Sequence, residues 1–406
     1  MATGPLTGVK VIDWTIWQQG PICSMILGDM GADVIKLESP DGDPGRGLLS
    51  ISRASTNLKG GVNAYFEANN RNKRGIVLDL KKAEAREVVY KLVRDSDVFV
   101  QNYRKGVAER LGMGYETLKE RNPGLIYAWC NGFGPEGPEA DRPAFDMIAQ
   151  GRSGFMYASV SLGGDPRGVE TGISDQMGGT VLALGVLGAL CARASTYGQG
   201  QKVEVSLLGS MVWLQGLGLA QGLLTKGWRP SPDRKTAANP MYNYYHCKDG
   251  RWFELMNLQQ DRYWVDFCRI LGRPSLASDP RFADTPARAK NAAELIAILD
   301  QIFLTRTYDE WKEELLKADM VFGHIQRLSE LEHDPQIIAN QYITETVHPT
   351  VGPIKVPNHP VRYSGTPAGI SSAAPELGQH TEEVLIERLG YTWEEIEKLR
   401  DAGAIL

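Results

Sequence analysis

The sequence predicts an α/β protein whose first half forms a parallel sheet. Over the first two hundred residues, short apolar runs alternate with longer helix-like segments. The spacing is that of β-α-β units, in which a helix leads the chain back to the next parallel strand. The composition, 42% hydrophobic and 23% charged residues, is typical of a folded globular chain. At about 150 residues per domain, the length of 406 residues predicts two or three domains.

The first elements follow this alternation in order. VKVIDW at 9–14 is a short apolar strand, and a polar loop with Gly20-Pro21 follows it. PICSMILGDMG at 21–31 predicts a helix that ends at its glycine, and ADVIKLE at 32–38 the next strand. The pattern returns at 75–102 as GIVLDL, a helix AEAREVVYKLVRD and the strand DVFVQN, and LIYAWCN at 125–131 adds a further strand.

The segments between and after these strands are of mixed character. Residues 39–61 are rich in Gly, Ser, Asp and Arg and predict a long surface loop, and 132–172 are glycine-rich and irregular. QMGGTVLALGVLGALCARAS at 176–195 predicts a helix that is apolar nearly all round, so we expect it to be buried. VEVSLL at 203–208 predicts one more short strand.

A change in composition near 226–240 indicates a linker, and amphipathic helices follow it. The helical segments are YWVDFCRIL, ARAKNAAELIAILDQIFL and TYDEWKEELLKA. The last begins with Thr307-x-x-Glu310, a capping box that satisfies free N–H groups at a helix start. Residues 345–375 are rich in Pro and Gly and predict extended chain, and HTEEVLIERLG with WEEIEKLRDAG predicts closing helices.

The overall charge and composition exclude several classes of protein. The 44 basic and 49 acidic side chains give a net charge of −5, which provides no general attraction to nucleic acid or an anionic membrane. The five cysteines are too scattered for a disulfide framework, and the first residues lack the pattern of a signal peptide. The apolar run at 180–192 is shorter than the roughly 20 residues that span a bilayer. We therefore expect a cytoplasmic protein.

Common catalytic motifs are missing from the chain. TIWQQGP follows the first strand where a dinucleotide-binding loop would read G-x-G-x-x-G, and no phosphate-binding G-x-x-x-x-G-K-[ST] occurs. GRSGF lacks the second glycine of the G-x-S-x-G hydrolase motif. His246 and Cys247 are adjacent and would point apart on a strand, so we predict no metal site. All six histidines lie at or after His246, so chemistry in the first 245 residues must proceed without imidazole.

Two carboxylates flank the glycine-rich stretch and are candidates for catalysis. Asp175 precedes the apolar helix, so it is either an N-cap or an ionised nucleophile, and the two roles are compatible. A helix N-terminus lowers the pKa of a carboxylate, which keeps a nucleophile charged. Asp146 by itself is most typical of a solvated or capping residue. Gln18 and Gln19, after the first strand, are either loop residues or amide donors into a site.

Motifs along essentially the whole chain resemble family III CoA-transferases, which include formyl-CoA:oxalate and carnitine CoA-transferases. The segments that carry the resemblance include GVKVIDWTIWQQGP, LGDMGADVIKLESPDGDPGR, DVFVQNYRKGVAERLG, PAFDMIAQGRSGFM and TGISDQMGGTVLALGVLGAL. Later ones are SDPRFADTPARAKN, EHDPQIIANQYI and GQHTEEVLIERLG.

The resemblance implies a mechanism with Asp175 as the nucleophile. Its carboxylate would attack an acyl-CoA thioester to give a mixed anhydride and free CoA thiolate, which then forms an aspartyl-CoA thioester. The carboxylate of the acceptor acid attacks that thioester, and the thiolate finally takes the acceptor's acyl group. No step transfers a proton, which accounts for the lack of local histidine.

The resemblance also implies roles for other residues. Gln18 would donate its amide to the anhydride oxygens or to the acceptor, and Asp146 would steer substrate or oppose charge near Asp175. The positions that contact CoA in the family match Gln19, Leu78, Lys81, Asn102, Tyr103 and Arg110. Coenzyme A and acyl-CoA are substrates, and no tightly bound cofactor is implied.

The chain departs from the formyl-CoA enzyme at several positions. Ser39 and Pro143 stand where that enzyme has an arginine and a lysine that contact CoA, so these two contacts are either absent or replaced, with Arg46 and Lys36 as candidates. NPMYNYYHC stands in place of its glycine-rich lid, which favours a larger acid than oxalate or formate. Aromatic side chains of this segment, with Trp14 and Trp17, would line such a pocket or pack in the core.

Two alternative functions remain open. An α-methylacyl-CoA racemase resembles the chain over the same regions, but its second acid/base, a histidine, is replaced here by Phe145. The other alternative is a non-catalytic, CoA-binding subunit of a heteromeric transferase. The presence of Asp175 and Gln18 favours a transferase over both.

The resemblance implies a large Rossmann-like domain, a small α/β domain and an interlocked dimer. Residues 1–225 would form the first part of the large, CoA-binding domain, 226–240 a linker and 241–330 the small domain. Residues 331–406 would form a return linker and the last part of the large domain. The Pro-rich stretches at 228–240 and 349–367 fit two long linkers between the domains.

Overall fold

The computed structural model describes residues 4–51, 53–158, 160, 163–195, 197–228 and 233–406. The chain divides into two compact units. The first is made of Met1–Met156, Pro166–Trp228 and Asn340–Leu406, and the second of Tyr157–Asp165 and Arg229–Ala339. Residues 229–232 of the predicted 226–240 linker lie outside the described ranges.

A six-stranded parallel sheet forms the centre of the first unit, so the predicted α/β class is confirmed. The strand order is β5-β2-β1-β6-β7-β8. Counted along the chain within this sheet, that is 3-2-1-4-5-6, the order of a doubly wound fold. The strands are β1 (Lys10–Trp14), β2 (Asp33–Glu38), β5 (Lys73–Val77), β6 (Val98–Gln101), β7 (Ile126–Asn131) and β8 (Lys202–Ser206).

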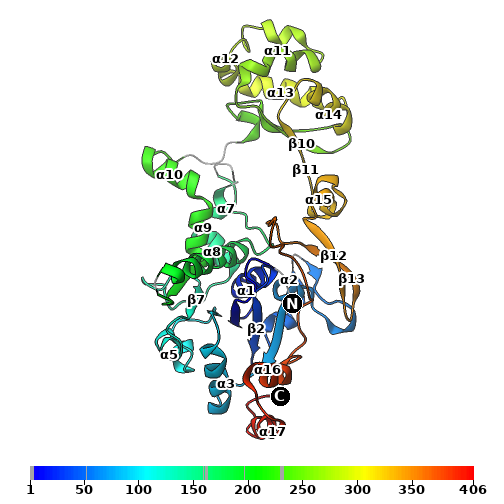
Figure 1. Ribbon diagram of the computed structural model, residues 1–406. Helices are drawn as coiled ribbons and strands as arrows, with labels where there is room; N and C mark the ends of the chain where they lie inside the picture. The colour runs from blue at the N-terminus through cyan, green and yellow to red at the C-terminus, as the bar shows by residue number, and fades with distance from the viewer. Residues whose placement is uncertain (1–3, 52, 159, 161–162, 196, 229–232) are drawn as a thin grey trace. The chain divides into compact units, whose positions relative to one another are not determined.

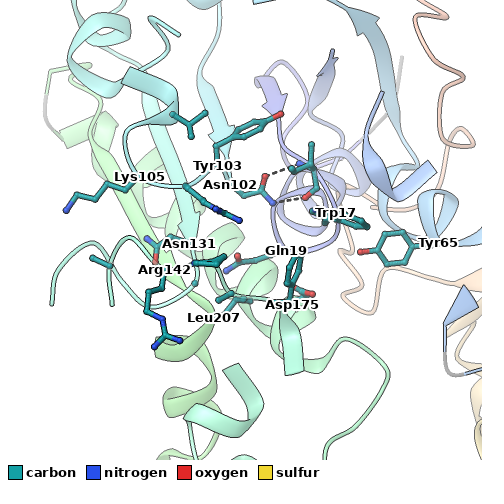
Figure 2. Close-up of a pocket in the computed structure, with 18 residues that line it drawn as sticks. Trp17, Gln19, Tyr65, Asn102, Tyr103, Lys105, Asn131, Arg142, Asp175 and Leu207 are labelled. Carbon is teal, nitrogen blue, oxygen red and sulfur yellow. Dashed lines mark hydrogen bonds between the residues drawn. The ribbon is translucent and has the colours of Figure 1, made fainter. Parts of the chain in front are cut away.

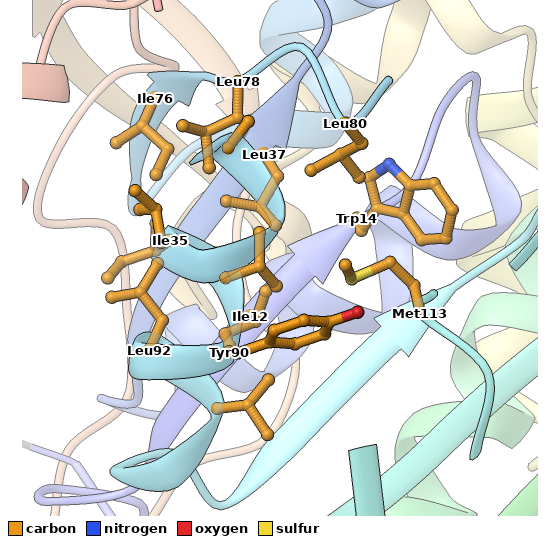
Figure 3. Close-up of a cluster of buried hydrophobic side chains, with 14 of the residues drawn as sticks. Ile12, Trp14, Ile35, Leu37, Ile76, Leu78, Leu80, Tyr90, Leu92 and Met113 are labelled. Carbon is orange, nitrogen blue, oxygen red and sulfur yellow. The ribbon is translucent and has the colours of Figure 1, made fainter. Parts of the chain in front are cut away.

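Hydrophobic side chains cover both faces of this sheet because residues alternate along each strand. Ile12 and Trp14 of β1 point to one face and Val11 to the other. Figure 3 shows the first face, where strand residues pack against helix α3 (Ala83–Arg94). The C-terminal helices α16 (Thr381–Leu389) and α17 (Trp393–Asp401) add side chains to the same cluster, so both ends of the chain build one core (Figure 1).

The second face is covered by helices α1 (Gln19–Asp29) and α8 (Ile173–Ser195), which pack against each other. The apolar helix was predicted to begin at residue 176, but α8 begins earlier and has 23 residues. It is therefore long and apolar enough to cross a membrane by length and composition, so the argument from a short apolar run is wrong. Such a test is also met by core helices, and α8 contacts α1, α9, β7 and β8.

The expectation that this helix is buried is correct for only part of its residues. Side chains such as Leu182 and Val186 are buried, but Leu184 is 66% exposed. The physical reason is that α1 and the sheet cover one side of α8 only. Its composition is apolar on both sides, so periodicity did not reveal the uncovered one.

The first unit contains further short elements, one of which, at 155–158, ends in the second unit. The strands are β3 (Ser50–Ile51), β4 (Ala54–Ser55), β12 (Ile343–His348) and β13 (Gly352–Pro357), the last two forming an antiparallel hairpin in the stretch expected to be extended. The helices are α2 (Ala64–Asn70), α4 (Val107–Arg110), α5 (Tyr115–Arg121), α6 (Asp146–Arg152), α7 (Phe155–Ala158), α9 (Leu207–Leu214) and α10 (Gly216–Thr225). Residues 207–208 were predicted to end a strand but begin α9.

The second unit packs helices on an antiparallel sheet. Its strands β9 (Tyr242–His246), β10 (Trp252–Met256) and β11 (Phe322–Ile325) have the order β11-β10-β9. Its helices are α11 (Gln260–Ile270), α12 (Thr285–Lys290), α13 (Ala292–Phe303), α14 (Tyr308–Lys317) and α15 (Pro335–Ala339). The predicted helix at 287–304 is broken between α12 and α13, and the Thr307–Glu310 capping box at α14 is confirmed.

Candidate active site

The site lies where the direction of strand order changes, between β1 and β6. In a doubly wound sheet the loops after these two strands leave in opposite directions and open a crevice. Residues 15–18 connect β1 to α1, and residues 102–106 connect β6 to α4. These loops bring together Ile16, Trp17, Asn102 and Tyr103.

The loop after β1 is fixed by side chains from other elements. Asn102 brackets Ile16, because its Oδ1 accepts the Ile16 N–H at 2.9 Å and its Nδ2 donates to the Ile16 carbonyl at 2.7 Å. Asp43 Oδ1 accepts the N–H of Trp17 at 3.0 Å. Trp17 has a left-handed backbone with φ of 65°, which is costly for a bulky residue and is held by these contacts.

Glycines of α8 and of the residue before it let the two glutamines approach closely. A Cβ at Gly172 would collide with the side-chain amide of Gln18. A Cβ at Gly178 would lie 2.7 Å from Nε2 of Gln19, and a Cβ at Gly179 would lie 2.6 Å from the Gln19 carbonyl. The segment TGISDQMGG therefore has glycines on both sides of Asp175 for a packing reason.

Asp175 is the third residue of α8 and does not cap it, so the predicted N-cap role is wrong. Asp146 of α6 takes that role instead. Its Oδ1 accepts the N–H of Ser174 at 2.6 Å and the N–H of Asp175 at 3.2 Å. Its Oδ2 accepts Nε2 of Gln150 at 2.5 Å. The carboxylate of Asp146 thus satisfies N–H groups at the start of α8, so the side chain of Asp175 is not needed as the cap.

The pKa of Asp175 is raised to about 7, first by burial and then by the charge of Asp146. The sequence predicted a lowered pKa at a helix N-terminus, and this prediction is wrong. The reason is that the helix N–H groups bind Asp146, while Asp175 loses water and faces a like charge. Burial and the charge of Asp175 raise the pKa of Tyr65, so this phenol keeps its proton.

Two cavities meet at Asp175, which lines both. The first has a volume of about 330 Å³ and includes Trp17, Gln19 and Asn102 in its wall (Figure 2). The second has a volume of about 1000 Å³, and its wall includes Gln18 and Asp146. Much of this second wall is apolar, with Ile22, Met25, Ile26, Met147, Ala183 and Leu187 among its residues.

The structure brings together most of the residues predicted for the site. Gln19, Asn102 and Tyr103 line the first cavity, and Gln18, Asp146 and Asp175 line the second. Three other predicted CoA contacts, Leu78, Lys81 and Arg110, are absent from the described lining of both. Leu78 is buried in the core beside α3 (Figure 3), whereas Lys81 and Arg110 are exposed. Their contact with CoA stays a prediction.

Of the two cations expected to compensate for Ser39 and Pro143, neither is free. Lys36 is fully buried, and its Nζ lies 3.0 Å from Asp43 Oδ2, so the expectation that it reaches CoA is wrong. Arg46 binds both carboxylate oxygens of Glu38, at 2.8 and 2.7 Å. Trp14 packs in the core, whereas Trp17 and Pro143 line the first cavity.

Sequence reasoning missed several residues of the first cavity. Arg104 and Lys105 follow β6, and Asn131 ends β7, so their place at the carboxyl ends of parallel strands was a usable signal. Tyr65 and Arg142 come from segments with no such signal. Across the described ranges, no three His, Cys, Asp or Glu side chains cluster closely enough to hold a metal ion.

Comparison with known proteins identifies strong similarities over the whole chain. The family described as CoA-transferase family III matches residues 6–381. The chain is 32% identical over 401 residues to the (R)-2-hydroxy-4-methylpentanoate CoA-transferase of Clostridioides difficile, covering 98% of this chain and 99% of the relative. It is 33% identical to the cinnamoyl-CoA:phenyllactate CoA-transferase of Clostridium sporogenes, covering 98% and 96%.

A solved structure shows the same similarity in three dimensions. A CAIB/BAIF family protein from Brucella suis aligns with a TM-score of 0.84 at 30% identity. The alignment covers 95% of this chain and 99% of that protein.

Proposed function

The chain belongs to CoA-transferase family III, and we propose that it transfers CoA from an acyl-CoA thioester to a carboxylic acid through covalent intermediates on Asp175. Transferase activity with CoA thioesters is the activity of this family. The observation that supports Asp175 as the nucleophile is its position at the point where two cavities meet, as a carboxylate that forms no ion pair with any of the described residues.

The reaction proceeds in four exchanges without a proton. A carboxylate oxygen of Asp175 attacks the thioester carbon, the C–S bond breaks, and its electron pair leaves on sulfur as thiolate. The thiolate attacks the Asp175 carbonyl of the anhydride and releases the donor acid as its carboxylate. The acceptor carboxylate then attacks the aspartyl-CoA thioester, and the thiolate attacks the resulting anhydride at the acceptor's carbonyl, which restores Asp175.

Gln18 and Asp146 have different roles in this proposal. Gln18 lies on the side of the second cavity and donates its amide to the acyl or acceptor oxygens. Asp146 is a positioning residue, because its hydrogen bonds to the N–H groups of Ser174 and Asp175 fix the first turn of α8. Its charge also sets the pH at which Asp175 becomes a nucleophile.

The first cavity is the proposed CoA site. Gln19 and Tyr103 line it, and Arg104, Lys105 and Arg142 give it cationic side chains that suit phosphates. Asn102 contributes to this site mainly by fixing the loop after β1, because both the oxygen and the nitrogen of its side-chain amide bind the backbone of Ile16. Leu78, Lys81 and Arg110 are proposed to contact parts of CoA that extend beyond this cavity.

We also propose that two chains form an interlocked dimer with the domain boundaries at 225, 240 and 330, in the cytoplasm. Exposed apolar side chains on α9 and α10 support a partner chain: Trp213 is 74% exposed and Leu217 87%. Replacing Leu217 by Glu tests this. We expect light scattering to give the mass of a dimer for the wild type even on dilution, because interlocked chains cannot separate while folded, and we expect the variant to unfold at a lower urea concentration. A monomeric wild type would contradict the dimer.

The activity is tested by incubating the purified protein with a panel of acyl-CoA thioesters and carboxylic acids. We expect a new acyl-CoA in at least one pair, and hydroxylamine should convert Asp175 to its hydroxamate only when acyl-CoA is present. Transfer by an Asp175→Ala variant would contradict the proposed nucleophile. Exchange of the acyl-CoA α-proton with solvent would instead indicate a racemase, which Phe145 at the cavity makes unexpected.

A further inference from the structure

Two amide donors in the first cavity have no hydrogen-bond partner among the residues that the structure describes. They are Nε2 of Gln19 and Nδ2 of Asn131, and both atoms are buried. Both residues line the cavity that contains Asp175 (Figure 2). Buried polar groups are nearly always hydrogen-bonded, and an exception needs an explanation.

Packing and hydrogen bonding keep each amide in place. Gln19 begins α1, is only 5% exposed, and lies against Gly178, which is three residues after Asp175 on α8. Asn131 ends β7, and its Oδ1 accepts the N–H of Gly134 at 2.6 Å. With that oxygen engaged, the nitrogen of the same amide is left without an acceptor.

We propose that Gln19 and Asn131 together bind the CoA sulfur as its thiolate while Asp175 carries the acyl group. This inference rests on the proposed function and adds a site for the leaving group, which that function requires to stay bound. When the C–S bond breaks, the electron pair goes to sulfur, and the two N–H groups then donate hydrogen bonds to the new anion.

The chemistry of amides suits this anion. An amide N–H donates a hydrogen bond but does not give up its proton, so it stabilises the thiolate and leaves it nucleophilic for its return. An acidic donor such as a protonated histidine would quench it, and all six histidines lie at or after His246. The cationic residues of this cavity, Arg104, Lys105 and Arg142, are exposed and therefore suit the phosphates of CoA.

The positions of the other amides and carboxylates assign the sulfur to this side. Gln18 lines the second cavity, and so does Asp146. Asp175 separates the two sides and faces both. Gln18 therefore donates to the carboxylic acid that enters or leaves, and Gln19 and Asn131 donate to the sulfur.

The test follows free CoA bound to the enzyme, using the ultraviolet absorbance of the thiolate as pH is raised. The variants are Gln19→Met, which keeps the shape and removes the donor, and Asn131→Asp, which keeps the acceptor for Gly134. We expect each to weaken binding of the thiolate form about tenfold and to raise the pKa of the bound thiol. Desulfo-CoA, which lacks the sulfur, should bind all forms equally, and this also shows that the variants are folded.

The matched control is Gln18→Met, one residue away and on the other cavity, which should leave the thiol titration unchanged. The proposal is overturned if CoA and desulfo-CoA lose affinity equally, or if neither loses affinity. Because this experiment uses free CoA, it does not depend on turnover. A wild-type protein that binds thiolate as expected but transfers no CoA would contradict the proposed function alone.

Discussion

Two aspartates of the same unit, Asp13 and Asp175, have pKa values that are shifted in opposite directions. Asp13 on β1 is completely buried, and Lys73 Nζ lies 2.8 Å from its Oδ2. Burial raises its pKa, but Lys73 and Lys36 overcome that effect and bring it down to about 2. Asp175 is partly exposed to the cavities, and desolvation together with the charge of Asp146 raises its pKa to about 7.

The difference shows that the partner, rather than burial, decides what a buried carboxylate does. Asp13 accepts hydrogen bonds from Ser24 and Thr15 in addition to Lys73, so its charge is fully satisfied. Lys73 also donates to the carbonyl of Pro21, which ties β5 to the start of α1. Asp13 therefore stabilises the frame of the site, and Asp175 is left with a reactive charge.

The largest expected effect is the loss of CoA-transfer activity when Asp175 is replaced, and it distinguishes Asp175 from the structural Asp13. Asp175→Ala should reduce CoA transfer roughly 10⁴-fold or more, because the nucleophile is lost. The free energy of unfolding should not fall, since a buried carboxylate that faces a like charge contributes no stability. Steady-state kinetics and urea unfolding of the same preparation measure both quantities. A large loss of stability would show that Asp175 is structural, like Asp13.

The second effect is on stability. Lys73→Met should lower the free energy of unfolding by about 3–5 kcal/mol, because it leaves Asp13 charged and unpaired inside the protein. The double variant Asp13→Asn/Lys73→Met removes both charges and should recover most of the loss. Urea titrations of Lys73→Met, of Asp13→Asn and of the double variant give the coupling energy. If the double variant is as unstable as the sum of the single ones, the ion pair is not the cause.

The third effect is on pH dependence. Ionised Asp175 is the nucleophile, so kcat/KM should fall about tenfold per pH unit below the pKa of about 7. Asp146→Asn removes the like charge and keeps an oxygen for the N–H groups of α8, so this limb should move to lower pH. Tyr65 and Cys130 near Asp175 have pKa values raised by burial and stay protonated through this range. If the acidic limb of the pH profile does not move in Asp146→Asn, that limb reports the ionisation of a group other than Asp175.

The smallest expected effects come from removing one serine hydroxyl that binds Asp13 and one that binds Asp146, next to Asp175. Ser24 Oγ donates to Asp13 at 2.7 Å, and Ser24→Ala should cost about 1 kcal/mol of stability without moving the pH profile. Ser174 donates its hydroxyl to Asp146, so Ser174→Ala should cost about as much and also move the profile. Thermal unfolding and pH–rate curves for both variants check this. A shift of the pH–rate profile in Ser24→Ala would contradict this and would show that the ionisation of Asp175 depends on the contacts of Asp13.

Local patterns were enough to predict most of the fold. Alternating apolar runs such as VKVIDW and ADVIKLE became β1 and β2, and Thr307 with Glu310 formed the expected capping box, because these features depend on neighbours within a few residues. The candidates Asp175, Gln18 and Asp146 also came from the sequence, and they line one cavity. The exposed side of α8 could not be predicted from the sequence, because the residues of this helix are apolar on both sides.

The sequence by itself determined the alternation of strands and helices, the parallel sheet and the residues available for chemistry. Only the tertiary structure decided which of them are charged, paired or left free. Lys73 lies 60 residues from Asp13 along the chain, and Asp146 lies 29 residues from Asp175. Desolvation and Coulomb interactions depend on distance in space, so folding made one aspartate a structural ion and the other a candidate nucleophile.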